Sequence, residues 1–242
     1  MLNIDIENRV AAEVLHGATD VAVQQAESGW SSAAGKIRRQ KRIAFLGRGL
    51  DASAKILEVG CGTGLQTCEL AQKFHDIVAI DISPQLLAIA ERRAPGPRYE
   101  VMDAHHPTFS PCTFDAVLGV SILHHLEWET ALQSYYDLLK PGGRVRFSEP
   151  NLLNPQIFLQ KNIPILKRWA GDSPDEYAFT KWQIEGSLKR VGFRSIIVTP
   201  IEFLHPATPP RLIPLLSSLE RVLENTPIRH IGGSLLIEAV KE

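Results

Sequence analysis

The feature that most constrains this chain is a glycine-rich loop between an apolar segment and a helical pattern. Ile56 to Val59 is a short apolar run, Gly60, Gly62 and Gly64 follow it at alternating positions, and a helical pattern begins at Leu65. Glycine takes positive φ easily and lets the backbone approach a ligand closely. The amides at the start of the following helix point toward the same place. The loop therefore predicts an α/β fold that binds a nucleotide.

Short apolar segments alternate with helical patterns after this loop, and that order is typical of βαβ units around a parallel sheet. Ser83 and Pro84 provide an N-cap and a first helical position, and the run Lys140 to Gly143 ends another helix. We predict helices at 65–74, 84–92, 128–139 and 180–191, an amphipathic piece at 156–169 and a late helix ending near 224. We predict strands at 56–59, 77–80, 98–101, 114–119, 144–148, 195–201 and 234–240.

The length bounds the domain organisation. A chain of 242 residues is long enough for one large α/β domain and short for two. We therefore expect a single domain over 1–242, with an N-terminal helical cap at 1–50 and a ligand-binding core at 51–148. In the remaining half, 149–242, two irregular insertions at about 151–178 and 205–230 are expected to form a lid over the substrate.

Charge and cysteine content exclude several classes of function. The formal net charge of -1 gives no electrostatic case for a nucleic-acid partner. No pair of the three cysteines has CxxC spacing, so neither a disulfide framework nor a metal site is indicated. No apolar run is long enough to span a bilayer. We expect a cytoplasmic protein that has no metal and no stable membrane insertion.

Three further positions follow the glycine loop at useful distances. Asp81 ends the next predicted strand, 21 residues after Gly60, where a carboxylate can accept both hydroxyls of a ribose. Asp103, which precedes Ala104, follows the third strand and can accept the exocyclic amine of an adenine. The fourth strand is expected to bring Asp115 to the same carboxyl edge of the sheet.

A dinucleotide site is the main alternative. Its GxGxxG pattern needs the third glycine three residues after the second, and here Leu65 occupies that position while Gly64 comes one residue early. Glu58 also precedes the loop, and a carboxylate is unfavourable beside a pyrophosphate but acceptable beside a cation. An NAD(P)-dependent oxidoreductase therefore fits less well, and a catalytically silent nucleotide-binding protein stays open as a further alternative.

The run Glu58 to Gly64, with Asp81, Asp103-Ala104, 114–117 and 139–143, resembles the class I S-adenosylmethionine-dependent methyltransferases over about 55–148. The resemblance implies a Rossmann-like, three-layer αβα sandwich around a seven-stranded, mostly parallel sheet. Its last strand would be antiparallel and would lie at 234–240. It also implies methyl transfer from S-adenosylmethionine to an O-, N- or C-nucleophile of a small or medium-sized metabolite.

The same resemblance implies contacts with the cofactor. The glycine loop would face its methionine part, Asp81 its ribose, Asp103-Ala104 its adenine, and Leu86 would form a wall near the adenine. The predicted cofactor-binding residues are Glu58, Gly60, Cys61, Gly62, Gly64, Asp81, Ile82, Leu86, Asp103, Ala104 and Ser121.

Candidates for acid–base chemistry follow the fourth and fifth strands. His124 can accept a proton near neutral pH, and we place it toward the site while His125 packs or caps. Glu149 could orient or deprotonate an acceptor, and Asn151 could hydrogen-bond to it. For these side chains a structural role in packing or turn formation stays open. His105 and His106 are expected in a solvent-facing turn rather than at the site.

Three groups of residues have less specific interpretations. The basic run Arg38, Arg39, Lys41, Arg42 indicates a solvated helix face, with contact to a carboxylate, including that of the cofactor, as the alternative. An aromatic group either packs a lid or lines an acceptor pocket: Trp169, Tyr177, Phe179 and Trp182. A helical apolar stripe predicts core or homodimer contact rather than a membrane surface: Leu212, Leu215, Leu216, Leu219 and Val222.

Overall fold

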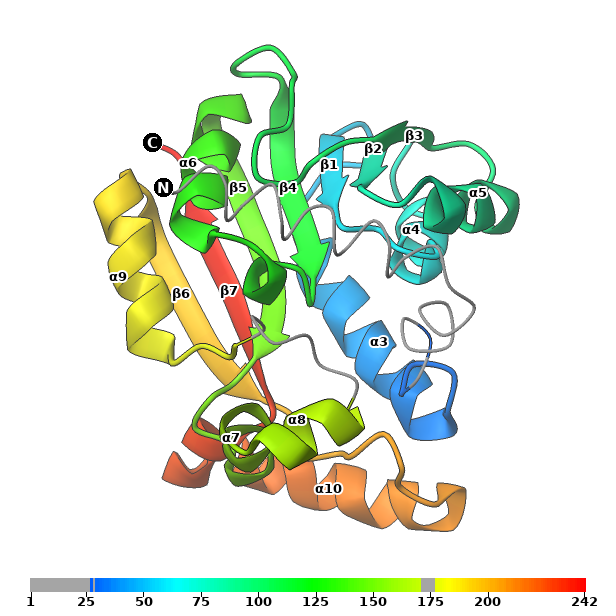
Figure 1. Cartoon of the computed structure of the whole chain (residues 1–242), viewed down its shortest axis with the longest axis vertical. Helices are drawn as coiled ribbons and strands as arrows, with labels where there is room; N and C mark the ends of the chain where they lie inside the picture. The colour runs from blue at the N-terminus through cyan, green and yellow to red at the C-terminus, as the bar shows by residue number, and fades with distance from the viewer. Residues whose placement is uncertain (1–26, 28, 171–176) are drawn as a thin grey trace.

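The computed structural model describes residues 27, 29–170 and 177–242, and its centre is a seven-stranded sheet (Figure 1). The order of the strands across the sheet is β3-β2-β1-β4-β5-β7-β6. Their bounds are β1 Lys55–Val59, β2 Asp76–Asp81, β3 Arg98–Val101, β4 Phe114–Val120, β5 Leu139–Pro150, β6 Arg194–Ile201 and β7 Ser234–Val240.

The pairing directions confirm the predicted topology. β1 runs parallel to β2 and β4, and the outer pairs β2–β3 and β4–β5 are also parallel. β7 is antiparallel to both of its neighbours, β5 and β6. The last strand is thus the single reversed strand of the sheet.

Helices cover both faces of the sheet because alternate side chains of each strand point to opposite sides. Leu57 and Val59 of β1 pack in a cluster with α6 (Trp128–Leu138) and α9 (Lys181–Val191). Ile56 packs on the other face with α3 (Ala33–Leu46), α4 (Leu65–Leu70) and α5 (Pro84–Arg93). The result is the expected three-layer αβα sandwich.

The second half adds helices beyond the carboxyl end of β5. α7 (Pro155–Asn162) and α8 (Pro164–Ala170) follow that strand, and α10 (Ile213–Leu223) lies between β6 and β7 in the chain. Figure 1 shows these three helices grouped beyond one end of the sheet. The predicted single amphipathic piece at 156–169 is two helices, because Pro164 has no backbone N–H to continue α7.

Several predicted bounds are wrong. The helix expected at 65–74 ends at Leu70, and the strand expected at 144–148 extends over Leu139–Pro150. Within the cap expected at 1–50 the structure describes α3, and residues 1–26 and 28 lie outside the described part. Residues 171–176 of the first lid insertion also lie outside it.

The basic run on α3 is not a solvated face, and this expectation is wrong. Arg42 is buried, and both of its terminal nitrogens donate hydrogen bonds to the carboxylate of Glu202, at 2.7 Å each. Arg38 donates to the same carboxylate at 2.7 Å, Arg39 pairs with Glu69, and Lys41 pairs with Glu220. The run therefore contacts carboxylates of this chain, and it anchors α3 to the segment after β6.

Burial by itself would raise the pKa of Glu202, but the charges and hydrogen bonds of Arg42 and Arg38 outweigh that effect and lower it to about 2. A carboxyl whose pKa is lower in the folded state stabilises the fold above its unfolded pKa. For Glu202 this stabilisation is therefore present above pH 4.5 and is lost as the pH falls toward about 2.

Replacing Glu202 with Gln should destabilise the fold, because it leaves two arginines facing a neutral group in a buried site. We expect a loss of about 3–5 kcal/mol in the free energy of unfolding at pH 7, measured by urea denaturation. The control is Glu129→Gln at the exposed Arg190–Glu129 pair, which should cost no more than about 1 kcal/mol. Equal losses in the two variants would contradict the structural importance of Glu202.

Candidate active site

The candidate site lies at the carboxyl ends of β1, β2 and β4. The chain leaves β1 toward β2 on one side, and β4 later pairs with the other side of β1. Connections that depart in opposite directions open a crevice outside the strand ends, where α/β proteins bind nucleotides. The loop 60–64 begins at the end of β1 and leads into α4.

The three loop glycines all take positive φ, at 66°, 54° and 75° for Gly60, Gly62 and Gly64. They differ in what surrounds them. A Cβ on Gly64 would lie 2.8 Å from the backbone of Ala90 in α5, and a Cβ on Gly60 would lie 2.5 Å from the side chain of Ile122. A Cβ on Gly62 would meet no atom of the described residues within 4 Å. Gly60 and Gly64 are thus needed for packing, while no described side chain or backbone crowds Gly62.

The Asp81 carboxylate is oriented by backbone amides from two segments. Oδ2 accepts from the amide of Gly62 at 2.8 Å, and Oδ1 accepts from the amide of Ser83 at 2.9 Å. An ionised carboxylate has about four acceptor sites, more than these two bonds use. Asp81 can therefore hold the glycine loop and accept ligand hydroxyls at the same time.

Glu58 is buried directly below the loop, and its Oε2 atom has no hydrogen-bond partner among the described residues. Burial is the main cause that raises the pKa of Glu58 to about 7, and the charge of Asp81 raises it further. Burial likewise raises the pKa of the Cys61 thiol, which disfavours a thiolate. The hydrogen bond that Thr67 makes with the Glu58 carboxyl offsets the rise in its pKa only in part. A buried carboxyl with one oxygen that lacks a donor suits a ligand that carries positive charge.

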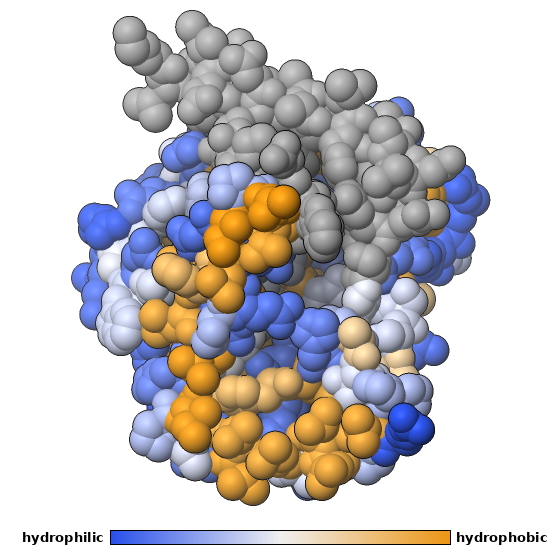
Figure 2. Space-filling model, turned by 60° about the horizontal axis from the view of Figure 1, so that its bottom comes forward, coloured by the Kyte–Doolittle hydropathy of each residue, from blue (hydrophilic) through white to orange (hydrophobic). Residues whose placement is uncertain are grey.

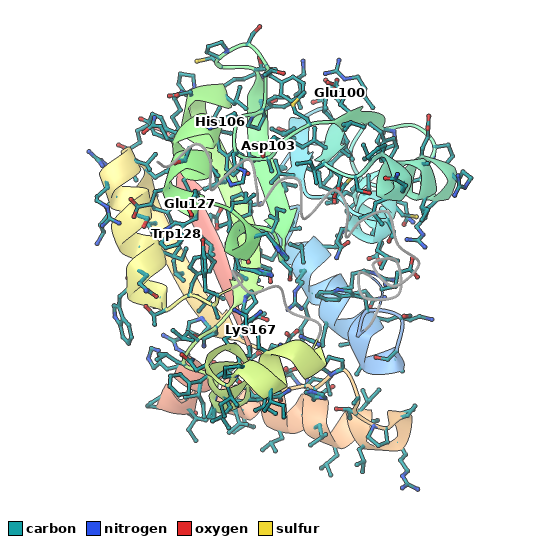
Figure 3. The ribbon with its side chains drawn as sticks, viewed as in Figure 1. Glu100, Asp103, His106, Glu127, Trp128 and Lys167 are labelled. Atoms are coloured by element: carbon teal, nitrogen blue, oxygen red, sulfur yellow. The ribbon has the colours of Figure 1, made fainter. Side chains whose placement is uncertain are left out.

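Asp103 is held by a buried histidine. Its Oδ1 accepts from the amide and from Nδ1 of His105, at 2.8 and 2.7 Å. Nε2 of His105 accepts from the amide of Glu127 at 3.1 Å, so the proton of the neutral ring is on Nδ1. Burial would raise the pKa of Asp103, but the bonds from His105 lower it below its usual value. Asp103 is therefore an ionised acceptor, and the ring of His105 links it to the backbone amide of Glu127; Figure 3 labels both residues.

The expectation that His105 faces solvent is wrong, since its side chain is buried. The expectation for Asp115 is also wrong. It lies at the amino end of β4, where it accepts from the Lys55 amide and from Nζ of Lys140, each at 2.8 Å. That edge of the sheet is opposite to the glycine loop, because β4 runs parallel to β1.

Glu149 links the ends of β4 and β5. Its Oε1 accepts from the amides of Ile122 and Leu123, each at 2.9 Å, and Oε2 accepts from Nδ1 of His124 at 2.7 Å. The glutamate is 1% exposed and His124 is buried. These bonds make Glu149 a positioning residue for the 122–124 turn, and the predicted catalytic roles of Glu149 and His124 stay predictions.

Asn151 holds another part of the fold. Its Nδ2 donates to the carbonyls of His230 and Gly232, at 2.9 and 2.7 Å, and its Oδ1 accepts from the amide of Leu153. The side chain is fully buried and ties the end of β5 to the segment before β7. Its predicted contact with an acceptor stays a prediction.

Other predicted cofactor residues lie around the same crevice. Ile82 and Leu86 follow β2, and Ala104, whose carbonyl accepts from the Tyr135 hydroxyl at 2.8 Å, follows β3. Ser121 follows β4 with a φ of 55°, and its amide donates to the carbonyl of Ser148. A non-glycine residue at positive φ marks a backbone that its surroundings hold in place.

Sequence reasoning missed Arg93, which braces the loop from behind. Its Nη1 donates to both the carbonyl and the hydroxyl of Thr63, at 2.7 and 2.8 Å. A cation in the last turn of a predicted helix is common, so the sequence contained no specific signal for this contact.

Among the predicted aromatic group, Tyr177 and Phe179 pack edge to face on Trp128, whereas Trp182 is 61% exposed. The side chain of Trp169 lies outside the described part.

Comparisons with known proteins agree with this geometry. A family model for a methyltransferase domain matches residues 57–147. The matched region is a methyltransferase domain, and the chain is similar to the class I S-adenosylmethionine-dependent methyltransferases. A demethylmenaquinone methyltransferase of Paenarthrobacter aurescens is 28% identical over 155 residues, which cover 60% of each chain. Phosphoethanolamine N-methyltransferase 1 of Arabidopsis thaliana is 32% identical over 154 residues, 61% of this chain and 30% of the relative.

Solved methyltransferase structures share the fold. The N-methyltransferase NodS of Bradyrhizobium japonicum, solved with S-adenosylhomocysteine, aligns with a TM-score of 0.63 and 15% identity over 97% of this chain and 98% of its own. Phosphoethanolamine N-methyltransferase 2 of Haemonchus contortus aligns with a TM-score of 0.66 and 20% identity, over 92% and 57%. The chain spans about 60% of the length of the first curated relative.

The residues present fit the cofactor of this family. No described residue crowds Gly62, Asp81 presents an oriented carboxylate, and Glu58 has one buried oxygen without a donor among the described residues, which suits a cation. Among the described residues no group of three or more histidines, cysteines or acids is placed to hold a metal ion. None of the described helices is long and apolar enough to cross a membrane.

Replacing Asp81 with Ala should weaken binding of S-adenosylhomocysteine at least about tenfold, because both the ribose acceptor and the Gly62 contact are lost. Isothermal titration calorimetry measures this change. Asp76→Ala at the opposite end of β2 is the matched control and should bind as the parent chain does. Unchanged affinity in Asp81→Ala would exclude the ribose role.

Binding of the cationic cofactor should strengthen as the pH rises from about 6 to 8. The raised pKa leaves Glu58 partly protonated near pH 7, and a positively charged ligand favours its ionised form. Titration in buffers of different ionisation enthalpy should therefore detect proton release on binding. Glu58→Gln should abolish both the pH dependence and the proton release. If Glu58→Gln retains them, another group is responsible.

Proposed function

We propose that this chain transfers the methyl group of S-adenosylmethionine to a nucleophile of a small or medium-sized metabolite. The observation that carries the proposal is the loop after β1, where Asp81 holds the Gly62 amide and the end of the strand contains the buried carboxyl of Glu58, whose Oε2 atom has no partner among the described residues. This arrangement suits a nucleoside attached to a positively charged group better than a pyrophosphate, which Glu58 would repel. When bound, S-adenosylmethionine supplies an electrophilic methyl group on a sulfonium.

In the proposal, the chain binds and orients the cofactor with three carboxylates. Asp81 accepts from the ribose hydroxyls, and Asp103, kept ionised by His105, accepts from the adenine amine. Glu58 faces the charged methionine part. Alignment of the reacting groups and exclusion of water supply most of the acceleration that such a displacement needs.

His124 is the proposed proton acceptor for a nucleophile that carries a proton. Glu149 holds Nδ1 of this ring, so a neutral ring presents Nε2 as its acceptor, the arrangement used by carboxylate–histidine pairs. Such a base contributes about 10²–10⁴ in rate. The His124 ring is also packed against His125 at 4.2 Å between ring centroids, which limits its orientation.

The class of acceptor is proposed from the relatives and from the second half of the chain. The relatives' names describe methylation of demethylmenaquinone and of phosphoethanolamine, and one is an O-methyltransferase of Penicillium expansum. The helices α7 and α8 lie beyond the carboxyl end of β5, and Figure 3 shows Lys167 of α8 on that side. We propose that they border the acceptor. A cytoplasmic location and a homodimer stay predictions of the sequence.

Cofactor titration followed by a methylation screen tests the proposal. The chain should bind S-adenosylmethionine and S-adenosylhomocysteine at micromolar concentrations and should not bind NAD. With S-adenosylmethionine carrying a radioactive methyl group, at least one small metabolite should become labelled. Binding of NAD alone would favour an oxidoreductase, and cofactor binding without any labelled acceptor would favour a silent binding protein.

Replacing His124 with Ala should lower kcat by about 10² while leaving the affinity for S-adenosylhomocysteine within about twofold. The neighbouring His125→Ala is the control and should retain most of kcat. Raising the pH should partly restore the His124→Ala rate, because the acceptor then loses its proton without help. A full rate in His124→Ala would assign this residue a structural role only.

A further inference from the structure

An apolar surface remains on the second half of the chain. The outward positions of α10 are Leu215, Leu219 and Val222, which are 68%, 48% and 61% exposed. This spacing places them on one side of the helix, whose opposite side buries Ile213 and Glu220. The stripe was expected in the core or in a dimer contact, and in the structure only Leu216 packs against a core cluster, while the other four residues are exposed.

Neighbouring elements extend the surface. Phe158 and Leu159 of α7 and Ile165 of α8 are about half exposed, as are Ile228 and Ile231 of the short helix η3 (Pro227–Ile231). Figure 2, which brings the lower end of Figure 1 forward, shows apolar side chains gathered on that end. We name this set, with Leu212 and the α10 stripe, the apolar end surface. Soluble monomers rarely expose a continuous apolar area of this kind without a partner.

Three exposed positive charges flank the apolar end surface among the described residues. Arg211, Arg221 and Arg229 are exposed, and none of them forms an ion pair with a described residue. Two acidic residues lie in the last part of α10 and directly after it, and both are held by backbone amides of the segment after β6. Glu220 accepts from the amides of Phe203 and Leu204, and Glu224 accepts from the amide of Glu202. The apolar side chains are therefore flanked by outward positive charge on a chain whose net charge is -1.

This combination distinguishes between two possible occupants. A two-fold dimer would place the surface against its own copy, so that the three arginines of one subunit would approach those of the other. An anionic lipid bilayer instead attracts the arginines and accepts the apolar side chains at the level of its headgroups. Because no described helix can span a bilayer, such attachment would be peripheral.

We propose that the apolar end surface docks this chain on an anionic membrane surface, with Leu215, Leu219 and Val222 inserted at the headgroup level and Arg211, Arg221 and Arg229 facing the lipid phosphates. The surface lies on α7, α8, α10 and η3, outside the residues that surround the glycine loop. Docking and cofactor binding are therefore separate properties, and the proposal holds whether or not the chain is an active methyltransferase.

Flotation of the full chain with lipid vesicles tests this proposal. The chain should float with phosphatidylcholine vesicles that contain about one third phosphatidylglycerol, and at least about tenfold less with phosphatidylcholine alone. Salt at about 0.5 M should weaken the binding. Leu215→Ser/Leu219→Ser/Val222→Ser should reduce binding to the anionic vesicles by at least about tenfold. Val101→Ser/Ile197→Ser, at equally exposed positions of β3 and β6, should bind as the parent chain does.

A charge-reversal variant gives an independent measurement. Arg211→Glu/Arg221→Glu/Arg229→Glu should lose the preference for anionic vesicles, whereas the control Lys73→Glu/Arg92→Glu/Lys189→Glu, at exposed positions on other elements, should keep it. Thermal unfolding checks that each variant folds. If the triple serine variant does not fold, the charge-reversal variant alone tests the proposal. Binding of that variant to anionic vesicles as strong as that of the parent chain would then overturn it.

Three further results would overturn membrane docking. One is a parent chain that floats with neither kind of vesicle, and another is a triple serine variant that binds as well as the parent. The third is a concentration-dependent dimer of the parent chain in sedimentation experiments that neither surface variant forms. That result would assign the apolar end surface to a second copy of the chain.

Discussion

The hydrogen bond from the Gly62 amide to the Asp81 carboxylate is the contact on which the candidate site depends. It joins the loop after β1 to the end of β2, at 2.8 Å. Without it a loop that contains three glycines at positive φ would have little to limit its conformations. Arg93 braces the same loop through Thr63 from α5. The loop is thus held from both sides before any ligand binds.

Buried carboxylates also hold backbone amides or charged side chains in place at other strand ends. Glu149 holds two amides and a histidine after β4, and Glu202 holds Arg38 and Arg42 after β6. In each case the desolvated charge is balanced by several donors, which is the condition for a buried charge to be tolerated. Glu58 differs, because one of its oxygens has no such donor among the described residues. The carboxylates of Glu149 and Glu202 therefore stabilise the fold, whereas that of Glu58 keeps an oxygen that a ligand can contact.

The two halves of the chain bury their apolar residues differently. In the first half the strands are covered on both faces by α3 to α6, so almost every apolar side chain finds a neighbour. In the second half α7, α8 and α10 lie beyond the end of the sheet, and their outward sides remain apolar. Similarity to known proteins is also concentrated in the first half, at residues 57–147. The apolar end surface lies on elements outside that matched range.

The sequence by itself determined the order of the elements, the glycine loop, and the placement of Asp81 at the end of β2 and of Asp103 after β3. These features depend on local periodicity and on turn chemistry, which neighbouring residues specify. Tertiary structure decided which charged side chains are paired. Arg42 and Glu202 are 160 residues apart, and His105 reaches Glu127 across 22. No local pattern distinguishes such a pair from a solvated charge, so the basic run, His105 and Asp115 were assigned to the wrong environment until packing brought their partners together.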